Sequence, residues 1–170
     1  MSNKEKNIIE CIKKRRSVRC YNEKKVENSL VSFLLEAAIW APSGKNIQPW
    51  KFRVITEPEI IKQISKLMQS SRWLKNAPCL IFVFLDKSLV YEHTKDVLSC
   101  GAAIENILLS AYSVGLSTCW IGEILNHSNR ISSMLNLPCD KYELISVISI
   151  GYNDNKIKNI ERRALDDFII

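Results

Sequence analysis

A basic run near the N-terminus carries side chains that could bind a phosphate group. Residues 13–19 read Lys-Lys-Arg-Arg-Ser-Val-Arg, so that a hydroxyl interrupts a series of cations. Guanidinium groups bind phosphate in a bidentate way and a hydroxyl can complete the shell, so Arg15 and Ser17 are suitable ligands. In a continuing helix Arg15 and Arg19 would share a face, whereas in an extended segment residues 15, 17 and 19 would all point to one side. The extended form suits a ligand lying along the run, while the competing interpretation of Ser17 is a hydroxyl at a helix end.

A second segment with unusual chemistry is a loop between a helical pattern and a strand pattern. Residues 42–49 read Pro-Ser-Gly-Lys-Asn-Ile-Gln-Pro, and Trp50 follows. Two prolines fix the backbone, while hydroxyl and amide groups stand at defined positions. Such a loop suits a flat polar ligand. The alternative is a rigid structural loop in which Trp50 plugs the core.

Two further segments could contribute to the same site. Residues 115–122 read Gly-Leu-Ser-Thr-Cys-Trp-Ile-Gly after a long apolar helix pattern, and Arg162-Arg163 form a basic pair near the C-terminus. Either arginine of the pair could complete a phosphate site. Taken singly, Gly122 is better explained as a turn glycine and the pair as a solvated tail.

Other kinds of site lack their motifs. The five glycines are too far apart for a G-x-G-x-x-G fingerprint, and Gly44-Lys45 does not complete a P-loop. The six cysteines show no C-x-x-C spacing and are expected to be reduced, mostly buried thiols. His93 and His127 have no acidic neighbour at ligand spacing, so no metal site is expected. No Ser-His-Asp or Cys-His arrangement is visible.

Length and charge narrow the class of protein. A chain of 170 residues is most simply one domain, residues 1–170, and no stretch reaches the length of a membrane-spanning helix, so we expect a soluble cytoplasmic protein. The net charge of +6 resides in residues 1–25, which hold nine Lys or Arg against three Glu. Nucleic-acid binding is one explanation, but no recognition motif accompanies the charges. A phosphate-bearing cofactor needs fewer assumptions.

The hydrophobic pattern alternates helices and strands, which indicates an α+β fold. Helix 96–115 is apolar almost all round, which favours burial in a homodimer; a buried central helix in a monomer is the alternative. Strand 78–85 is continuously apolar and is expected at the centre of a sheet. The predicted helices are 3–16 with Asn3 as N-cap, 26–40, 58–68, 96–115 and 128–137, and the predicted extended segments are 51–55, 78–85, 119–122 and 143–152.

The four chemical segments, in this order and at this spacing, resemble the FMN-dependent nitroreductase family over nearly the whole chain. The resemblance implies a small, mostly antiparallel central sheet flanked by helices, with the long buried helix at about 96–115 and an intertwined homodimer. It also implies FMN as cofactor. In the family pattern, Arg15 and Ser17 match phosphate-contacting positions, Arg16 is adjacent, and Arg19 matches the basic residue at the flavin pyrimidine, where it would stabilise the anionic hydroquinone.

The other two motifs and the loop complete this implied site. The Pro42–Gly44 segment matches a loop that reaches the flavin of the partner subunit, and Ile121-Gly122 matches backbone beside the reactive ring nitrogen. The predicted cofactor-binding residues are Arg15, Arg16, Ser17, Arg19, Pro42, Ser43, Gly44, Asn46, Gln48, Ile121, Gly122, Arg162 and Arg163. No side chain is predicted to be catalytic itself.

The implied reaction is a ping-pong transfer of electrons from NADH, NADPH or another donor through FMN to a nitroaromatic, quinone or similar acceptor. Little chain is available between Asp86 and Asp96, or between Gly122 and Ser128, for a lid, so an open site is expected. Ala164 replaces the usual proline after the basic pair, and Arg72 is a weak candidate for a mid-chain flavin contact. The rival functions are a reductive dehalogenase or flavin-cleaving relative, a flavin-sequestering protein with little turnover, and a nucleic-acid binder.

Overall fold

The computed structural model describes residues 7–157 and 160–170, and its centre is a four-stranded antiparallel sheet. The strands are β1 (Trp50–Ile55), β2 (Cys79–Asp86), β3 (Ser117–Ile121) and β4 (Tyr142–Gly151), in the spatial order β1-β2-β4-β3. Both predicted central features are confirmed, since the sheet is antiparallel throughout and β2 lies inside it.

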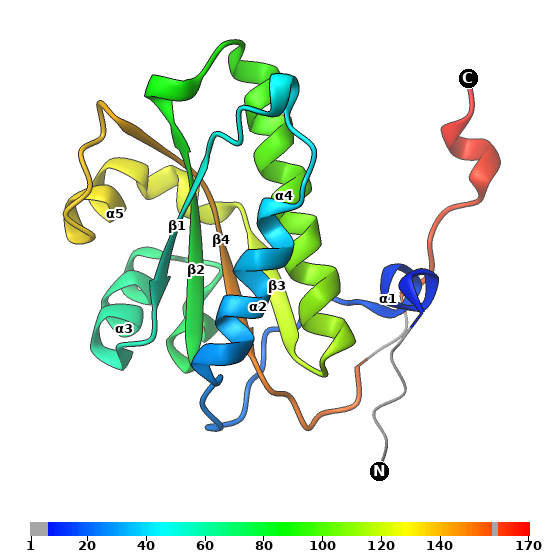
Figure 1. Ribbon diagram of the computed structural model, residues 1–170. Coiled ribbons are helices and arrows are strands. Elements are labelled where there is room, and N and C mark those ends of the chain that lie inside the picture. The colour runs from blue at the N-terminus through cyan, green and yellow to red at the C-terminus, as the bar shows by residue number, and fades with distance from the viewer. Residues whose placement is uncertain (1–6, 158–159) are drawn as a thin grey trace.

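Helices cover both faces of the sheet. Of the five, α2 (Asn28–Ile39) and α4 (His93–Ser113) pack on one face, and α3 (Pro58–Leu67) and α5 (Ser128–Met134) on the other, while α1 (Ile8–Lys14) lies beside α4 (Figure 1). Every residue of β2 is buried. Ile81, Val83 and Leu85 pack against α2 and α4, whereas Leu80, Phe82 and Phe84 join the core on the other face. Burial on both faces explains the continuous apolar run.

Capping residues set the helix boundaries that the periodicity missed. α4 begins at His93 rather than at residue 96 because the Glu92 carboxylate accepts hydrogen bonds from the N–H groups of Thr94 and Lys95. α5 ends at Met134 rather than at residue 137, because Asn136 adopts a left-handed conformation with φ of 54°. α3 begins at Pro58 and β4 closely follows its predicted range.

α1 differs most from its predicted range. It starts at Ile8 after Asn7, whose side-chain oxygen accepts a hydrogen bond from the Ile9 N–H at 2.8 Å. The predicted cap Asn3 lies outside the described residues. The apolar side of α1 is exposed: Ile8, Ile9 and Ile12 are 60, 54 and 52% accessible. This face is uncovered in the single chain.

The long helix α4 is buried on its sheet side. Ile104, Ile107 and Ala111 are fully buried there, but Leu98 on another side is 68% exposed. α2 and α1 also pack against α4, so the expected burial on more than one side is met within the described part of one chain. None of the helices among the described residues is both long and apolar enough to cross a bilayer.

The environments of the six cysteines predict two reactivity classes. Cys20 and Cys139 are exposed and the other four are buried. Burial raises the pKa of the Cys79 and Cys100 thiols to about 12, which suppresses the reactive thiolate. We expect two thiols to react promptly with an aromatic disulfide reagent at pH 8 in the native protein, and all six in denaturant. Prompt reaction of more than two native thiols, or of two in a Cys20→Ser variant, would contradict this assignment.

Candidate functional site

The basic run leaves the helix and continues in extended form. α1 ends at Lys14, and Arg15, the C-cap, has an extended backbone with ψ of 136°. Ser17 then forms a parallel bridge with Thr118 of β3, and the Val18 N–H donates to the Thr118 carbonyl at 2.9 Å. Of the two conformations considered from sequence, the extended one is observed. The segment is thus attached to the sheet edge beside β3.

The cations of this segment have different partners. Arg15 is a half-buried side chain whose Nε lies 3.9 Å from Glu105 Oε1 on α4. The Arg16 Nη1 donates to the carbonyl oxygens of Lys13 and Arg15, at 2.7 and 2.8 Å, so it occupies acceptors at the end of α1. The Arg16 Nε is buried and has no partner among the described groups. Because a buried donor without a partner is costly, an anion at this point would be stabilised.

A cavity of about 260 Å³ joins the basic segment to the end of β3. Arg19 lines one side, and Ile121 and Gly122 line another. Two of the four sequence motifs therefore meet in one place. A Cβ on Gly122 would meet no atom within 4 Å, so this side of the cavity is open. The complete lining is Arg19, Ser70, Ser71, Trp73, Cys119, Trp120, Ile121, Gly122 and Glu123.

Cys119 reports the electrostatics of this region. Burial raises the pKa of the Cys119 thiol, while Arg19, a hydrogen bond with Ser17 and Arg15 oppose the shift, in that order. Three members of the basic segment therefore act on one buried thiol that also lines the cavity. The positive charge of Arg15 and Arg19 lies near this sheet edge, where a phosphate or another anion would be favoured.

Sequence reasoning missed Glu123. Its Oε1 accepts hydrogen bonds from the N–H groups of Gln69 and Ser70 at 2.7 and 2.9 Å, and its Oε2 accepts from the Ser71 hydroxyl at 2.7 Å. The Ser70 N–H lowers the pKa of Glu123 most, burial opposes the shift, and the Ser71 hydroxyl lowers it further. A lowered folded-state pKa means that the bonded carboxylate persists at neutral pH and is lost only as the pH falls below the ordinary value of 4.5.

Arg72, the candidate for a mid-chain contact, does not line the cavity although Ser71 and Trp73 on either side do. Its side chain is exposed. The neighbouring serines, tied to Glu123, occupy this rim instead. The only sequence signal for them is an acidic residue directly after Gly122, which does not identify its partners.

The loop at residues 42–48 holds itself in an uncommon conformation. The Ser43 hydroxyl accepts from the Gln48 N–H at 3.0 Å, and the Gln48 side-chain amide donates to the Asn46 carbonyl and side-chain oxygens, both at 3.2 Å. Lys45, Asn46 and Gln48 have φ values of 53, 56 and 54°, in the left-handed region. Non-glycine residues persist there only when their surroundings fix them, which is common at functional sites. The loop is rigid and Trp50 is buried, as the structural alternative expects, and the role of the loop in binding a ligand stays a prediction.

This loop lines a different cavity from Arg19. Pro42, Ser43 and Gly44 face a space of about 270 Å³ whose other wall is α4, at Lys95, Leu98, Ser99 and Ala102. A single chain therefore does not bring the loop to the basic segment. The resemblance to nitroreductases places this loop at the partner's flavin, and that role stays a prediction.

Arg162 and Arg163 lie on a C-terminal segment that projects away from the sheet (Figure 1). Both are exposed, and the Arg163 guanidinium lies 4.5 Å from the centre of the Phe168 ring. The segment carries exposed apolar side chains, among them Leu165, Phe168 and Ile169. Neither arginine lines the cavity that contains Arg19.

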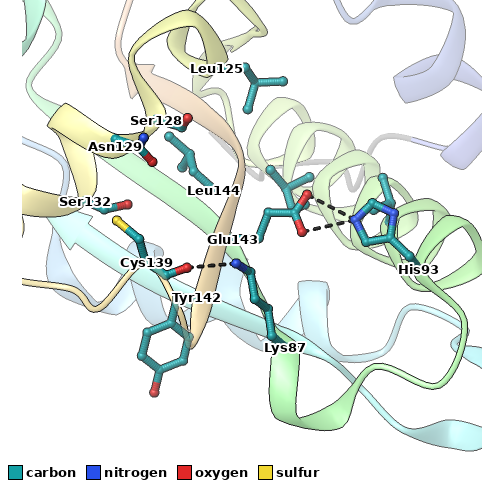
Figure 2. A pocket seen from close by; sticks show the side chains of 12 residues that line it. Lys87, His93, Leu125, Ser128, Asn129, Ser132, Cys139, Tyr142, Glu143 and Leu144 are labelled. Atoms are coloured by element: carbon teal, nitrogen blue, oxygen red, sulfur yellow. Dashed lines mark hydrogen bonds and ion pairs between the residues drawn. The ribbon is translucent and has the colours of Figure 1, made fainter.

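A larger cavity, of about 380 Å³, lies between the starts of α4 and β4 and the helix α5 (Figure 2). His93 Nε2 and Glu143 Oε2 form a pair at 3.0 Å on one side of it, and the Lys87 amine donates to the Cys139 carbonyl at 2.8 Å. None of the predicted cofactor-binding residues lines this cavity. We therefore centre the candidate site on the Arg19 and Gly122 cavity.

Comparison with known proteins gives one consistent result. The sequence model of the nitroreductase family matches residues 12–71 and 67–152. A protein of Archaeoglobus fulgidus provisionally named NADH dehydrogenase/NAD(P)H nitroreductase is 35% identical over 84% of this chain and 85% of its own. The crystal structure of a Desulfovibrio desulfuricans protein described as a nitroreductase in complex with FMN has a TM-score of 0.91 and 32% identity, covering 98% of this chain and 96% of that one.

A more distant relative bears on the dehalogenase alternative. An iodotyrosine deiodinase of Nematostella vectensis is 24% identical, and its alignment covers all of this chain and 76% of the deiodinase. The alignment runs over 208 positions although this chain has 170 residues, so the deiodinase contains inserted segments that are missing here.

Gly44 is required by its contact with Tyr91. A Cβ at Gly44 would lie 2.7 Å from two ring carbons of Tyr91, a ring that also faces the Lys45 ammonium at 4.8 Å. We expect Gly44→Ala to lower the free energy of unfolding by about 1–3 kcal/mol, as other overpacking substitutions do. In a Tyr91→Ala background the same substitution should cost clearly less. Urea unfolding of all four proteins measures this coupling, and equal costs in both backgrounds would show that the ring is not the constraint.

Proposed function

The chain belongs to the nitroreductase family, and from this premise we propose that it is an FMN-dependent oxidoreductase. Its electron donor is a reduced nicotinamide, and its acceptor is an electron-poor aromatic or quinone-like molecule. The observation that carries the proposal is the cavity shared by Arg19, Ile121 and Gly122 beneath the extended basic segment. The same cavity therefore contains the positive charge of Arg19 and the unobstructed backbone at Gly122.

The residues present fit FMN. The buried and unpartnered Arg16 Nε, the half-buried Arg15 and the exposed Ser17 hydroxyl offer donors for a phosphate group. Arg19 adds positive charge to the cavity itself. Within the chain these groups lie on one short stretch, so they would hold the phosphate end and the ring end of a ligand along a common line.

When bound, FMN supplies the transfer of two electrons between donor and acceptor. The residues of this chain bind FMN and orient it. Gly122 keeps the open side of the cavity free of a side chain, so that donor and acceptor can use the same approach in turn, as a ping-pong mechanism requires. Arg19 stabilises negative charge that develops in the cavity.

We propose that the working form is a homodimer with composite sites. Three apolar surfaces that are exposed in the single chain would be buried by a second subunit: the face of α1, Leu98 on α4, and the C-terminal segment. In a symmetric dimer, the Pro42–Gly44 loop, Asn46 and Gln48 would serve the cavity of the other subunit, and the Arg162-Arg163 pair would reach a phosphate there. This arrangement explains why one chain separates the loop from the basic segment.

A reductive dehalogenase is the second candidate, and the short chain argues against it. The deiodinase relative contains inserted segments that this chain lacks, and the connections after β2 and β3 are short 3₁₀ turns, Lys87–Leu89 and Glu123–His127. An open cavity without a covering segment favours varied flat acceptors over a single enclosed substrate.

The first test is spectroscopic. The purified protein is mixed with FMN, desalted, and then titrated with NADH or NADPH without oxygen. A retained yellow chromophore that bleaches supports the proposal and identifies the donor. A retained chromophore that stays oxidised favours a flavin carrier or another donor, and a colourless protein overturns the cofactor assignment.

Arg15 provides a sharper test, because FMN and riboflavin differ only in the phosphate. We expect Arg15→Ala to weaken FMN binding roughly 10-fold to 100-fold, the range for a lost hydrogen bond to a charged group, with little effect on riboflavin. Quenching of flavin fluorescence measures both affinities. Lys62→Ala, an exposed cation on α3, is the matched control and should change neither. Equal weakening of both flavins would show that Arg15 does not bind phosphate.

The proposed dimer predicts a specific effect of charge on α1. Ile8 and Ile12 are one helical turn apart on its exposed side. We expect the double variant Ile8→Asp/Ile12→Asp to be monomeric by light scattering and to lose most FMN affinity, with its melting temperature as a monitor of folding. Leu89→Asp, at another exposed apolar position, should stay dimeric. A dimeric Asp variant would exclude this face from the interface.

A further inference from the structure

Residues 68–71 connect α3 to the next short helix. α3 ends at Leu67, and the 3₁₀ helix Arg72–Asn76 begins after four intervening residues. Ser70 and Ser71 of this segment form one rim of the Arg19 cavity. The position of this rim therefore depends on what holds residues 69–71.

The carboxylate of Glu123 makes three hydrogen bonds to residues 69–71. Glu123 stands directly after Gly122, on the opposite rim, and accepts from the backbone of Gln69, the backbone of Ser70 and the hydroxyl of Ser71, at 2.7–2.9 Å. The partners lie 52–54 residues away in sequence. Hydrogen bonds to an ionised acceptor are short and strong, so three of them fix the segment relative to the end of β3.

We propose that Glu123 is a positioning residue that sets the width of the flavin cavity by joining the Ser70–Ser71 rim to the Gly122 rim. The inference rests on the proposed function, since it assigns the flavin to this cavity. Glu123 acts through the segment it holds. It neither binds the phosphate nor donates electrons.

Two features separate this role from a general structural one. Glu123 and both serines line the cavity itself, so a change in their spacing changes the volume available to a planar ligand. Ser71 is buried, and its hydroxyl donates to Glu123, so the bond fixes a side chain as well as the backbone. A displacement of about 1 Å is known to cost two orders of magnitude where geometry is tight.

Matched substitutions distinguish position from charge. Glu123→Gln removes the charge but keeps an oxygen that can accept from the two backbone N–H groups and an amide that can donate to the Ser71 hydroxyl oxygen. Glu123→Ala removes all three bonds. If Glu123 acts by position, the Gln variant should bind FMN within about threefold of the wild type and the Ala variant at least about tenfold more weakly.

The experiment combines FMN titration with amide hydrogen exchange on the FMN-free protein. We expect the Gln69 and Ser70 amides to exchange faster in Glu123→Ala than in wild type and Glu123→Gln, while the β2 amides stay protected in all three. Equal exchange in all three proteins, equal FMN affinity in the Ala variant and wild type, or Gln binding as weak as Ala would each overturn the inference. Should Glu123→Ala lose β2 protection, Ser71→Ala, which removes only the hydroxyl bond to Glu123, takes its place: weaker FMN binding than wild type supports the inference, and unchanged binding overturns it.

Failure of the proposed function gives a different result. In that case wild-type protein binds no FMN, whatever the exchange of residues 69 and 70. Wild-type binding together with an unaffected Ala variant leaves the function intact and rejects only the role of Glu123.

Discussion

One backbone hydrogen bond determines where the site can form. The Val18 N–H donates to the Thr118 carbonyl, beside the parallel bridge between Ser17 and Thr118. This bond attaches the basic segment to β3 shortly after the end of α1. It helps to fix Arg19 relative to Gly122, which directly follows the same strand. Pairing of the basic segment with the sheet thus brings the positive charge of Arg19 to the cavity. The sequence of charges alone does not specify this position.

The sequence was most informative where a local rule decides the structure. Pro58 at the first helical position and the apolar run of β2 need only steric and burial arguments, and both elements lie where they were expected. Helix ends that depend on individual residues were predicted less accurately. The Glu92 cap and the left-handed Asn136 depend on conformations that hydrophobic periodicity does not encode.

The residues of the candidate site also differ in how well the sequence predicted them. The family resemblance implied that Arg19 and the Ile121-Gly122 pair belong together, and the cavity contains all three. It did not anticipate the serines opposite, because the contact with Glu123 joins residues more than fifty positions apart. The loop at 42–48 was recognised from its composition, yet its left-handed backbone and the contact with Tyr91 follow from packing. Ligand roles for these residues rest on family membership and on the proposed experiments.

Arg16 shows how a binding segment can also be a structural one. Its Nη1 donates to two carbonyl oxygens at the end of α1, while its Nε is buried and has no partner among the described groups. An alanine scan through residues 15–19 would therefore mix two quantities, because loss at position 16 frays the helix even when no ligand is added. Measurements on the ligand-free protein are the baseline that separates them. The N-terminal helix and the anion site would then be thermodynamically linked, each strengthening when the other is formed.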